Sequence, residues 1–220
     1  MRHLGLHGLA AVAGWRTEPA PPDPSVRFDT TVEAEVEAAV DQVEAEVGPL
    51  HTVVAVAGFA HLDLATRVPA DRFRAVVDTN LTGAFLLARA GARRMVKRRA
   101  GRIILIGSVA GHWGVPGVTP YAASKAGLAG LARSLAREVG PRNITVNVVA
   151  PGLLDNAVDR LQSLRPAAST DADWLDATPA RRAGTADDIA AAVAFLASDA
   201  AAGVTGAVLP VDGGFGMSQA

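Results

Sequence analysis

The sequence contains no cysteine among its 220 residues. A disulfide framework, a thiolate nucleophile and a cysteine-based metal site are therefore excluded, and a reducing compartment is compatible with this composition. Neither sign of charge is in excess, because 21 Lys and Arg residues oppose 22 Asp and Glu residues and leave a formal net charge of −1. This balance gives no general argument for binding to nucleic acid or to an anionic membrane.

Long apolar runs are missing as well, since none approaches the roughly 18 residues that a membrane span needs. The first ten residues resemble a signal peptide only faintly, because His and Gly interrupt their short apolar stretch. We therefore expect a cytoplasmic protein that does not associate with membranes. Half of the residues are hydrophobic and a fifth are charged, as in globular proteins. The length predicts a single domain over residues 1–220.

Apolar runs of strand length alternate along the chain with segments of helical periodicity. The predicted strands are residues 9–14, 26–28, 51–57, 102–106, 144–149 and 204–211, and the main predicted helices are residues 32–47, 69–99, 121–139 and 185–196. This alternation predicts an α/β fold, a doubly wound parallel sheet covered on both faces. The acidic residues of helix 32–47 indicate a solvated face. The core candidates of helix 69–99 include Phe73, Val76, Phe85 and Met95. Thr185 with Asp188 resembles a capping box that opens helix 185–196. The irregular residues 163–184 indicate a mobile lid or substrate loop.

The stretch from Gly107 to Lys125 carries the chemistry. Tyr121 and Lys125 are four residues apart, so on a helix they lie on one face. We expect the ammonium to lower the pKa of the phenol and make it a proton donor near neutral pH. Ser108 follows the apolar strand 102–106, at the place where an α/β sheet positions its functional groups.

Several further motifs occur along the chain together with this stretch. They are Asn80-Leu81-Thr82-Gly83, Gly107-Ser108-Val109-Ala110-Gly111, Tyr121 with Lys125, residues 144–152 (ITVNVVAPG) and Phe195-Leu196-Ala197-Ser198. In this order they resemble the short-chain dehydrogenase/reductase family, and most closely its β-ketoacyl-acyl-carrier-protein reductases. The resemblance extends from about residue 12 to the C-terminus.

The resemblance implies four catalytic roles. Tyr121 would protonate the alkoxide that develops as hydride reaches a carbonyl carbon. Lys125 would lower the pKa of Tyr121 and hold the nicotinamide ribose. Ser108 would donate a hydrogen bond to the carbonyl oxygen. Asn80 would interrupt its helix and hold a water molecule that links Lys125 to solvent.

The family's cofactor loop, of the form Thr-Gly-x-x-x-Gly-x-Gly, is missing, because Gly5, Gly8 and Gly14 do not have this spacing. The preferred alignment equates residues 9–14 with the family's second strand, so a first strand–loop–helix unit of about thirty residues is absent. The competing alignment equates residues 11–14 with the first strand and deletes the next helix and strand. Either way we expect a Rossmann-like fold that is truncated at its N-terminus, unless the true start of translation lies upstream.

The resemblance nevertheless implies NADP as the cofactor. Arg16 suits a 2′-phosphate and so favours NADP over NAD. Asn156 replaces the threonine that usually meets the carboxamide, and Val56 replaces an asparagine beside the adenosine. The complete set of expected cofactor residues is Arg16, Asp29, Thr30, Val56, Ala57, Gly58, Tyr121, Lys125, Pro151, Gly152, Leu154 and Asn156.

Partners and alternative functions also follow from the resemblance. Arg99 and Arg142 match residues thought to dock an acidic acyl carrier protein, and Trp113 and Trp174 are candidate walls of a substrate site. The helix from Tyr121 has a face of small residues, so we expect a homo-oligomer, either a dimer or a tetramer. The first hypothesis is an NADP-dependent reductase of a 3-oxoacyl thioester or related ketone. The alternatives are a cofactor-independent dehydratase, cyclase or isomerase, or a non-catalytic subunit of a complete homologue.

Overall fold

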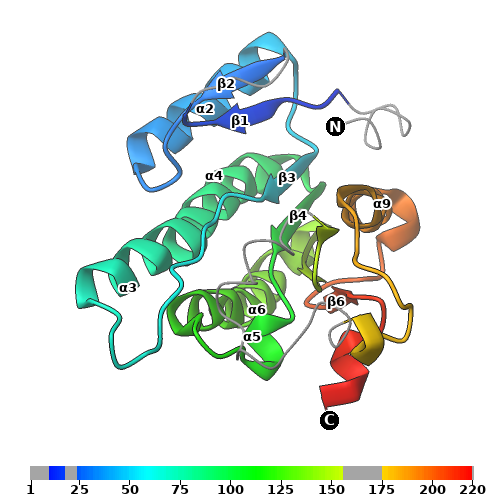
Figure 1. The fold of residues 1–220 in the computed structure, drawn as a ribbon. Helices are drawn as coiled ribbons and strands as arrows, with labels where there is room; N and C mark the ends of the chain where they lie inside the picture. Colours follow the sequence, from blue (N-terminus) through cyan, green and yellow to red (C-terminus); the bar gives the residue numbers. More distant parts are fainter. Residues whose placement is uncertain (1–9, 18–23, 156–174, 220) are drawn as a thin grey trace.

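The computed structural model describes residues 10–17, 24–155 and 175–219. Their strands form two parallel sheets (Figure 1), one of order β1-β2 and one of order β3-β4-β5-β6. The strands are β1 (Ala13–Trp15), β2 (Ser25–Arg27), β3 (Thr52–Ala55), β4 (Gly101–Ile106), β5 (Ile144–Pro151) and β6 (Val208–Val211). The strands therefore follow the predicted order, and the α/β class is confirmed.

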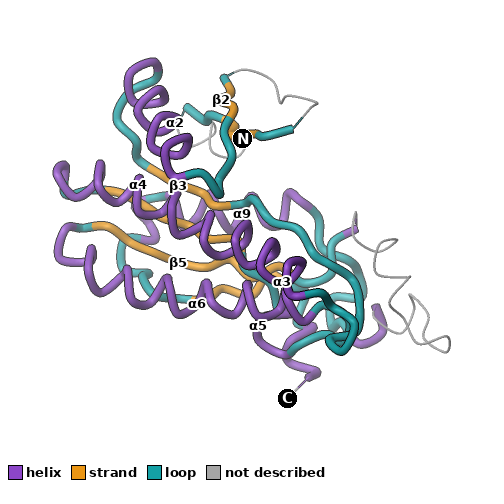
Figure 2. Tube along the Cα trace, turned by 90° about the vertical axis from the view of Figure 1, so that its left-hand side faces the viewer, coloured by secondary structure: helices purple, strands orange, loops and turns teal. Residues whose placement is uncertain are grey.

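Helices cover both faces of the four-stranded sheet. The helices of the described residues are α2 (Glu33–Glu46), α3 (Ala70–Val77), α4 (Gly83–Arg98), α5 (Ala110–Trp113), α6 (Thr119–Val139) and α9 (Ala186–Ala197). Figure 2 shows α6 running alongside β5. One apolar cluster joins β3, β4 and β5 to α4 and α6, and a second joins β4 and β5 to α9. Figure 1 accordingly shows α4 and α6 on the left of the sheet and α9 on its right. Among the described residues, no helix is long and apolar enough to cross a bilayer.

The sequence predicted the elements better than it predicted which side chains are buried. Thr185 and Asp188 form the predicted capping box at the start of α9. Met95 and Val76 are fully buried core residues, as predicted. Phe73 and Phe85, which were also expected in the core, are each 40% exposed. That expectation was wrong because both rings lie on the outer side of a helix that buries its opposite side.

The sheet is interrupted between β1 and β3. β1 pairs with β2 alone, and β3 pairs with β4 alone, in the part of the chain that the structure describes. This pairing agrees with the alignment that makes residues 9–14 the family's second strand, since the first strand would lie beside β3. The competing alignment would have placed β1 against β3, and the structure contradicts it.

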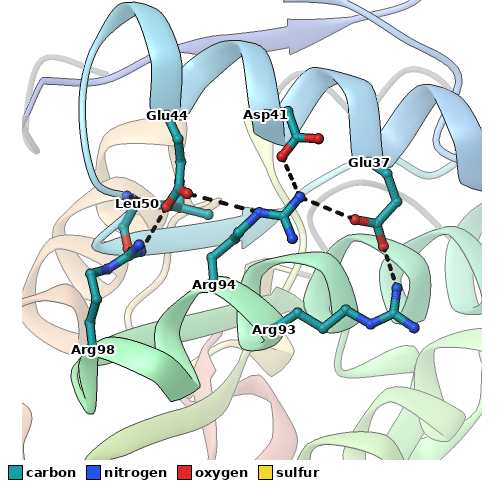
Figure 3. A network of polar contacts seen from close by, with 7 residues as sticks. All are labelled: Glu37, Asp41, Glu44, Leu50, Arg93, Arg94 and Arg98. Carbon is teal, nitrogen blue, oxygen red and sulfur yellow. Dashed lines mark hydrogen bonds and ion pairs between the residues drawn. The ribbon is translucent and has the colours of Figure 1, made fainter.

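The unit of β1, β2 and α2 is held to α4 by apolar packing and by a row of ion pairs. Arg93 and Arg94 of α4 reach Glu37 and Asp41 of α2, and Arg98 donates to Glu44 at 2.7 Å (Figure 3). The expectation of a solvated acidic face on α2 is confirmed for Glu33, Glu35, Asp41 and Glu46, which are exposed, and was wrong for the half-buried Glu37 and Glu44. These two carboxylates face the arginines of α4 because the two helices lie side by side above a shared cluster that includes Val36, Leu86 and Ala90.

Candidate active site

Ser108 is fixed at the carboxyl end of β4 by the residues on either side of it. The Gly107 amide donates to the Val149 carbonyl at 2.7 Å, and the Val109 amide donates to the Pro151 carbonyl at 3.0 Å. These two bonds continue the β4–β5 pairing past the end of the strand. The Ser108 hydroxyl oxygen accepts from the Ala110 amide at 3.2 Å and is also hydrogen-bonded to the Tyr121 hydroxyl.

Tyr121 and Lys125 lie one turn apart at the start of α6, as the sequence predicted. The ammonium nitrogen of Lys125 is 5.6 Å from the centre of the Tyr121 ring. It donates to the Ile106 carbonyl at 2.7 Å, and the lysine is only 6% exposed. Close packing of α5 on α6 requires Gly111, since a Cβ there would lie 2.7 Å from the Ala126 nitrogen. The side chains of Ser108, Tyr121 and Lys125 therefore converge between the end of β4 and the start of α6.

Burial sets the titration of both groups. It raises the pKa of Tyr121 above its ordinary value, and the hydrogen bond from Ser108 opposes that rise. Burial also lowers the pKa of Lys125 from 10.5 to about 8. The expectation of a lowered pKa for the phenol was therefore wrong, because burial of Tyr121 raises it. At neutral pH the phenol carries its proton and most of the lysine is charged.

Asn80 does interrupt its helix, as predicted, through a π-helical segment at Asp78–Thr82. Its amide oxygen accepts from the Phe59 N–H at 2.9 Å, and its amide nitrogen donates to the Phe59 carbonyl at 3.0 Å. The same nitrogen donates to Ser124 Oγ at 3.0 Å. Asn80 is 1% exposed, so these bonds satisfy a buried amide. The predicted water-holding role remains a prediction.

Ser124 was not singled out by the sequence reasoning. It is fully buried, accepts from Asn80 and donates to the Tyr121 carbonyl at 2.7 Å. It thus connects the π-helical segment to the first turn of α6. The available signal was its position directly before Lys125, on the same turn as Tyr121.

The residues present fit the nicotinamide ribose end of the cofactor. Gly58 lies against the catalytic cluster, since a Cβ there would be 3.0 Å from Asn80 Oδ1 and 3.3 Å from Lys125 Nζ. Lys125 uses one of its three N–H groups on Ile106, which leaves donors for ribose hydroxyl groups. Pro151 is buried at the end of β5, and Gly152 packs against Asp212.

The other expected cofactor residues are scattered around the carboxyl ends of the strands. Arg16 and Asp29 are brought together by an ion pair of 3.1 Å. The pKa of Asp29 is lowered, first by the Thr31 backbone amide and, against the effect of burial, by the Thr31 hydroxyl and by Arg16. Thr30 instead packs against the start of α4, because its hydroxyl would be 2.9 Å from a Cβ at Gly83.

The residues expected to bind the adenosine and the carboxamide of the cofactor form a less complete site. Val56 is 63% exposed, and Ala57 beside it is exposed as well, so neither residue forms a wall of an adenosine site. Leu154 forms an isolated bridge with Gly184. Asn156 and Trp174 lie outside the described residues. The sequence supplies no glycine-rich turn for the pyrophosphate, and the described residues therefore fit one end of the nucleotide only.

Arg99 and Arg142 are exposed neighbours, because the Arg99 guanidinium donates to the Pro141 carbonyl at 2.9 Å. They directly precede β4 and β5, so they lie at the opposite end of the sheet from Ser108. Of the basic residues around Arg99 in the sequence, Arg93, Arg94 and Arg98 are paired with acids of α2. No group of three His, Asp or Glu residues in the described segments could hold a metal ion.

Comparisons with known proteins agree with this geometry. A family model described as enoyl-(acyl carrier protein) reductase matches residues 11–216. The 3-oxoacyl-[acyl-carrier-protein] reductase MabA of Mycobacterium avium is 45% identical over 194 residues, which are 88% of this chain and 74% of MabA. The corresponding reductase FabG of Escherichia coli K12 is 45% identical over 190 residues, 86% of this chain and 76% of FabG.

Solved structures agree at the level of the fold. A crystal structure from Agrobacterium tumefaciens, whose description relates it to a gluconate dehydrogenase, superposes with a TM-score of 0.81 at 31% identity. The match covers 87% of this chain and 75% of that one. The motifs, the convergent Ser108, Tyr121 and Lys125, and these matches together show that the chain belongs to the short-chain dehydrogenase/reductase family of oxidoreductases.

Proposed function

We propose that this protein reduces a 3-oxoacyl thioester, carried by an acyl carrier protein, with NADPH as the reductant. One observation carries the proposal, namely the hydrogen-bonded pair of Ser108 and Tyr121 beside the buried Lys125. MabA and FabG, which share up to 45% of their aligned residues with this chain, are named as reductases of that substrate class.

The chain's own residues perform the proton chemistry of this reaction. The raised pKa of Tyr121 keeps its phenol protonated, so it can donate that proton to the substrate oxygen as negative charge develops there. The Ser108 hydroxyl would donate a hydrogen bond to the same substrate oxygen and so stabilise its developing charge. Lys125 is then the nearby positive charge that stabilises the phenolate left behind.

NADPH, when bound, supplies the hydride. Lys125 and Gly58 would hold its nicotinamide ribose, Pro151 and Gly152 would lie beside the ring, and Arg16 would meet the 2′-phosphate. Arg16 has to exchange its bond to Asp29 for that phosphate, and its side chain is 57% exposed, so the exchange costs little.

We also propose that the protein forms a homo-oligomer. Ala126 and Gly130 are exposed on α6, and a Cβ at Gly130 would meet no atom within 4 Å, so a second copy has room to approach closely. We also propose that Arg99 and Arg142 bind an acidic carrier protein. Because they lie at the far end of the sheet from Ser108, a carrier docked there would deliver its acyl group to the site of a second subunit.

One observation favours a second candidate, an enzyme that uses the same acid and base without a nicotinamide. The chain has no glycine-rich turn after a first strand, and Val56 stands exposed where the adenosine would lie. Proton transfer by Tyr121 and Lys125 would then serve a dehydration, cyclisation or isomerisation. A non-catalytic subunit of a complete homologue is the third candidate, and the exposed small face of α6 favours it.

Equilibrium binding of NADPH separates the first candidate from the others. We expect NADPH fluorescence to rise on titration with the folded protein, and Lys125→Met to weaken binding by about tenfold or more through loss of ribose contacts. Arg16→Ala should weaken NADPH more than NADH, which serves as the control for a 2′-phosphate contact. If folded protein binds no NADPH at millimolar concentration, the reductase proposal is wrong.

A further inference from the structure

The first turn of α6, which carries Tyr121, lacks a side-chain cap. Val118, the residue that precedes the helix, makes no side-chain hydrogen bond to it. The first amides of an α-helix have no partner within the helix, and a helix without a capping side chain is less stable at its start. Tyr121 is the third residue of α6, so contacts from outside the helix matter most for its position.

The hydroxyl of Ser124 provides such a contact, because it links this turn to the π-helical segment. It donates to the Tyr121 carbonyl at 2.7 Å and accepts from Asn80 Nδ2 at 3.0 Å. Ser124 is 0% exposed and Asn80 is 1% exposed, so no solvent competes for these bonds. A buried hydroxyl that is satisfied on both sides confines its partners, since breaking either bond leaves a polar group unpaired.

Asn80 is itself held in place by its surroundings. Its side chain binds both backbone groups of Phe59, at 2.9 and 3.0 Å. The next residue, Leu81, packs closely on α6, because a Cβ at Gly127 would lie 2.8 Å from Leu81 Cδ2. Asn80 therefore has little freedom to move, and it is a fixed point to which the Ser124 hydroxyl is attached.

The position of this turn decides the geometry of the candidate active site. The Tyr121 hydroxyl is hydrogen-bonded to Ser108, which hydrogen bonds between the residues after β4 and β5 hold in place. The ring of Tyr121 also lies beside Lys125, whose ammonium nitrogen is 5.6 Å from the ring centre. A shift of the first turn relative to β4 would lengthen the bond between the two hydroxyl groups. Misplacing a reacting group by about 1 Å can lower a rate by about 10²-fold.

We propose that Ser124 is a positioning residue, which holds the first turn of α6 where the phenol of Tyr121 meets Ser108 and the substrate oxygen. It does so by joining the Tyr121 carbonyl to Asn80. The inference rests on the proposed function, because the role that it assigns to Ser124 lies in the proton transfer from Tyr121. Ser124 is fully buried and acts only through Tyr121, so it is not itself a catalytic residue.

The chain offers a direct readout of this role, because Tyr121 is its only tyrosine. The near-ultraviolet absorbance of tyrosinate in an alkaline titration therefore reports this one phenol, without NADPH or substrate. The hydrogen bond from Ser108 lowers the pKa of Tyr121 against the effect of burial. A loosened turn should weaken that bond, so Ser124→Ala should shift the titration to higher pH, in the same direction as Ser108→Ala.

Steady-state kinetics test the same role in the reductase reaction. Ser124→Ala should lower kcat about tenfold and change KM little, because a displaced acid weakens the transition state and not substrate binding. Ser134→Ala, which changes an exposed serine of the same helix, is the matched control and should behave as the wild type. Ser124→Ala combined with Asn80→Ala should lose no more activity than Asn80→Ala alone, since the hydroxyl then has no fixed point.

The outcomes separate positioning from stability. A lower melting temperature for Ser124→Ala with an unmoved Tyr121 titration would overturn the proposal, and so would additive losses of kcat in the double variant. Should the alanine variant not fold, Ser124→Cys gives the same reading, because its thiol fills the site and weakens both hydrogen bonds. A shifted titration in a protein without reductase activity would refute the proposed function and support the link, since the titration needs no turnover.

Discussion

Asn80 and Phe59 exchange two hydrogen bonds, one from the Phe59 N–H to Oδ1 at 2.9 Å and one from Nδ2 to the Phe59 carbonyl at 3.0 Å. The amide of a single side chain thus binds the loop after β3 as a neighbouring strand would. This attachment brings Gly58 against Lys125. The position of the lysine therefore depends on a side chain 45 positions earlier in the sequence.

Asn80→Ala should lower both stability and turnover. It removes three hydrogen bonds of a buried amide and leaves the buried Ser124 hydroxyl without its Asn80 partner, and we expect the free energy of unfolding to fall by about 2–3 kcal/mol. Urea denaturation measures this loss. Asp78→Asn, an exposed change in the same π-helical segment, should alter the stability by less than about 0.5 kcal/mol. Equal losses in the two variants would show that the segment, and not the amide of Asn80, carries the effect.

Gly58→Ala should disturb the cluster from its solvent side. The new Cβ would lie 3.0 Å from Asn80 Oδ1 and 3.3 Å from Lys125 Nζ, so one of these groups must move. We expect a cost of about 1–2 kcal/mol in thermal unfolding. Gly140→Ala is the control, because a Cβ there meets no atom within 4 Å and the backbone at Gly140 is right-handed helical. It should leave the stability unchanged or raise it slightly.

Lys125 should make stability depend on alkaline pH. Its pKa is about 8 in the folded protein and 10.5 in the unfolded chain, so the unfolded state binds more protons between these values. The free energy of unfolding therefore rises with pH across this window and is constant below it. Relative to Lys125→Met, the wild type should gain roughly 2–3 kcal/mol between pH 8 and 10.5. Parallel stability curves for the two proteins would contradict the assigned burial of this ammonium.

The ion pairs between α2 and α4 should make the attachment of the N-terminal unit sensitive to salt. Arg94 contacts Glu37 and Asp41 and lies 3.8 Å from Glu44. Raising the salt concentration should speed amide exchange in β1, β2 and α2 by about three- to fivefold, which corresponds to about 1 kcal/mol. Exchange in β4 and β5 should be unaffected. Arg94→Met should show faster exchange at low salt and a smaller further response, because the ion pairs of Arg93 and Arg98 remain. An unchanged salt response would assign the effect to other groups.

The sequence predicted most elements of the fold because their signals are local. The capping box of Thr185 and Asp188 and the apolar run of β4 can be read within a few residues. The predictions that were wrong concern residues whose contact partners are distant in the sequence. The acidic residues of α2 form ion pairs with arginines of α4 that lie about 50 positions later, and no local pattern predicts that pairing.

The candidate site also has features that the sequence predicted and features that it did not. The spacing of Tyr121 and Lys125 fixed their shared helix face, and Ser108 followed a strand that is easily recognised. The direction of the Tyr121 pKa shift was missed, because it depends on how deeply the tertiary structure buries the phenol. The role of Ser124 was missed for the same reason, since its partner Asn80 lies 44 positions away.

Tyr121 is the acid of a carbonyl reductase in the proposed function. The most direct test of this role is the consumption of NADPH in the presence of an acetoacetyl thioester of acyl carrier protein, measured for the wild type and for Tyr121→Phe. We expect the wild type to oxidise NADPH in proportion to the hydroxyacyl product, and the variant to lose about 10²–10⁴-fold in kcat with its fold intact. A folded wild-type protein that binds NADPH but does not oxidise it, or a variant as active as the wild type, would contradict this role of Tyr121.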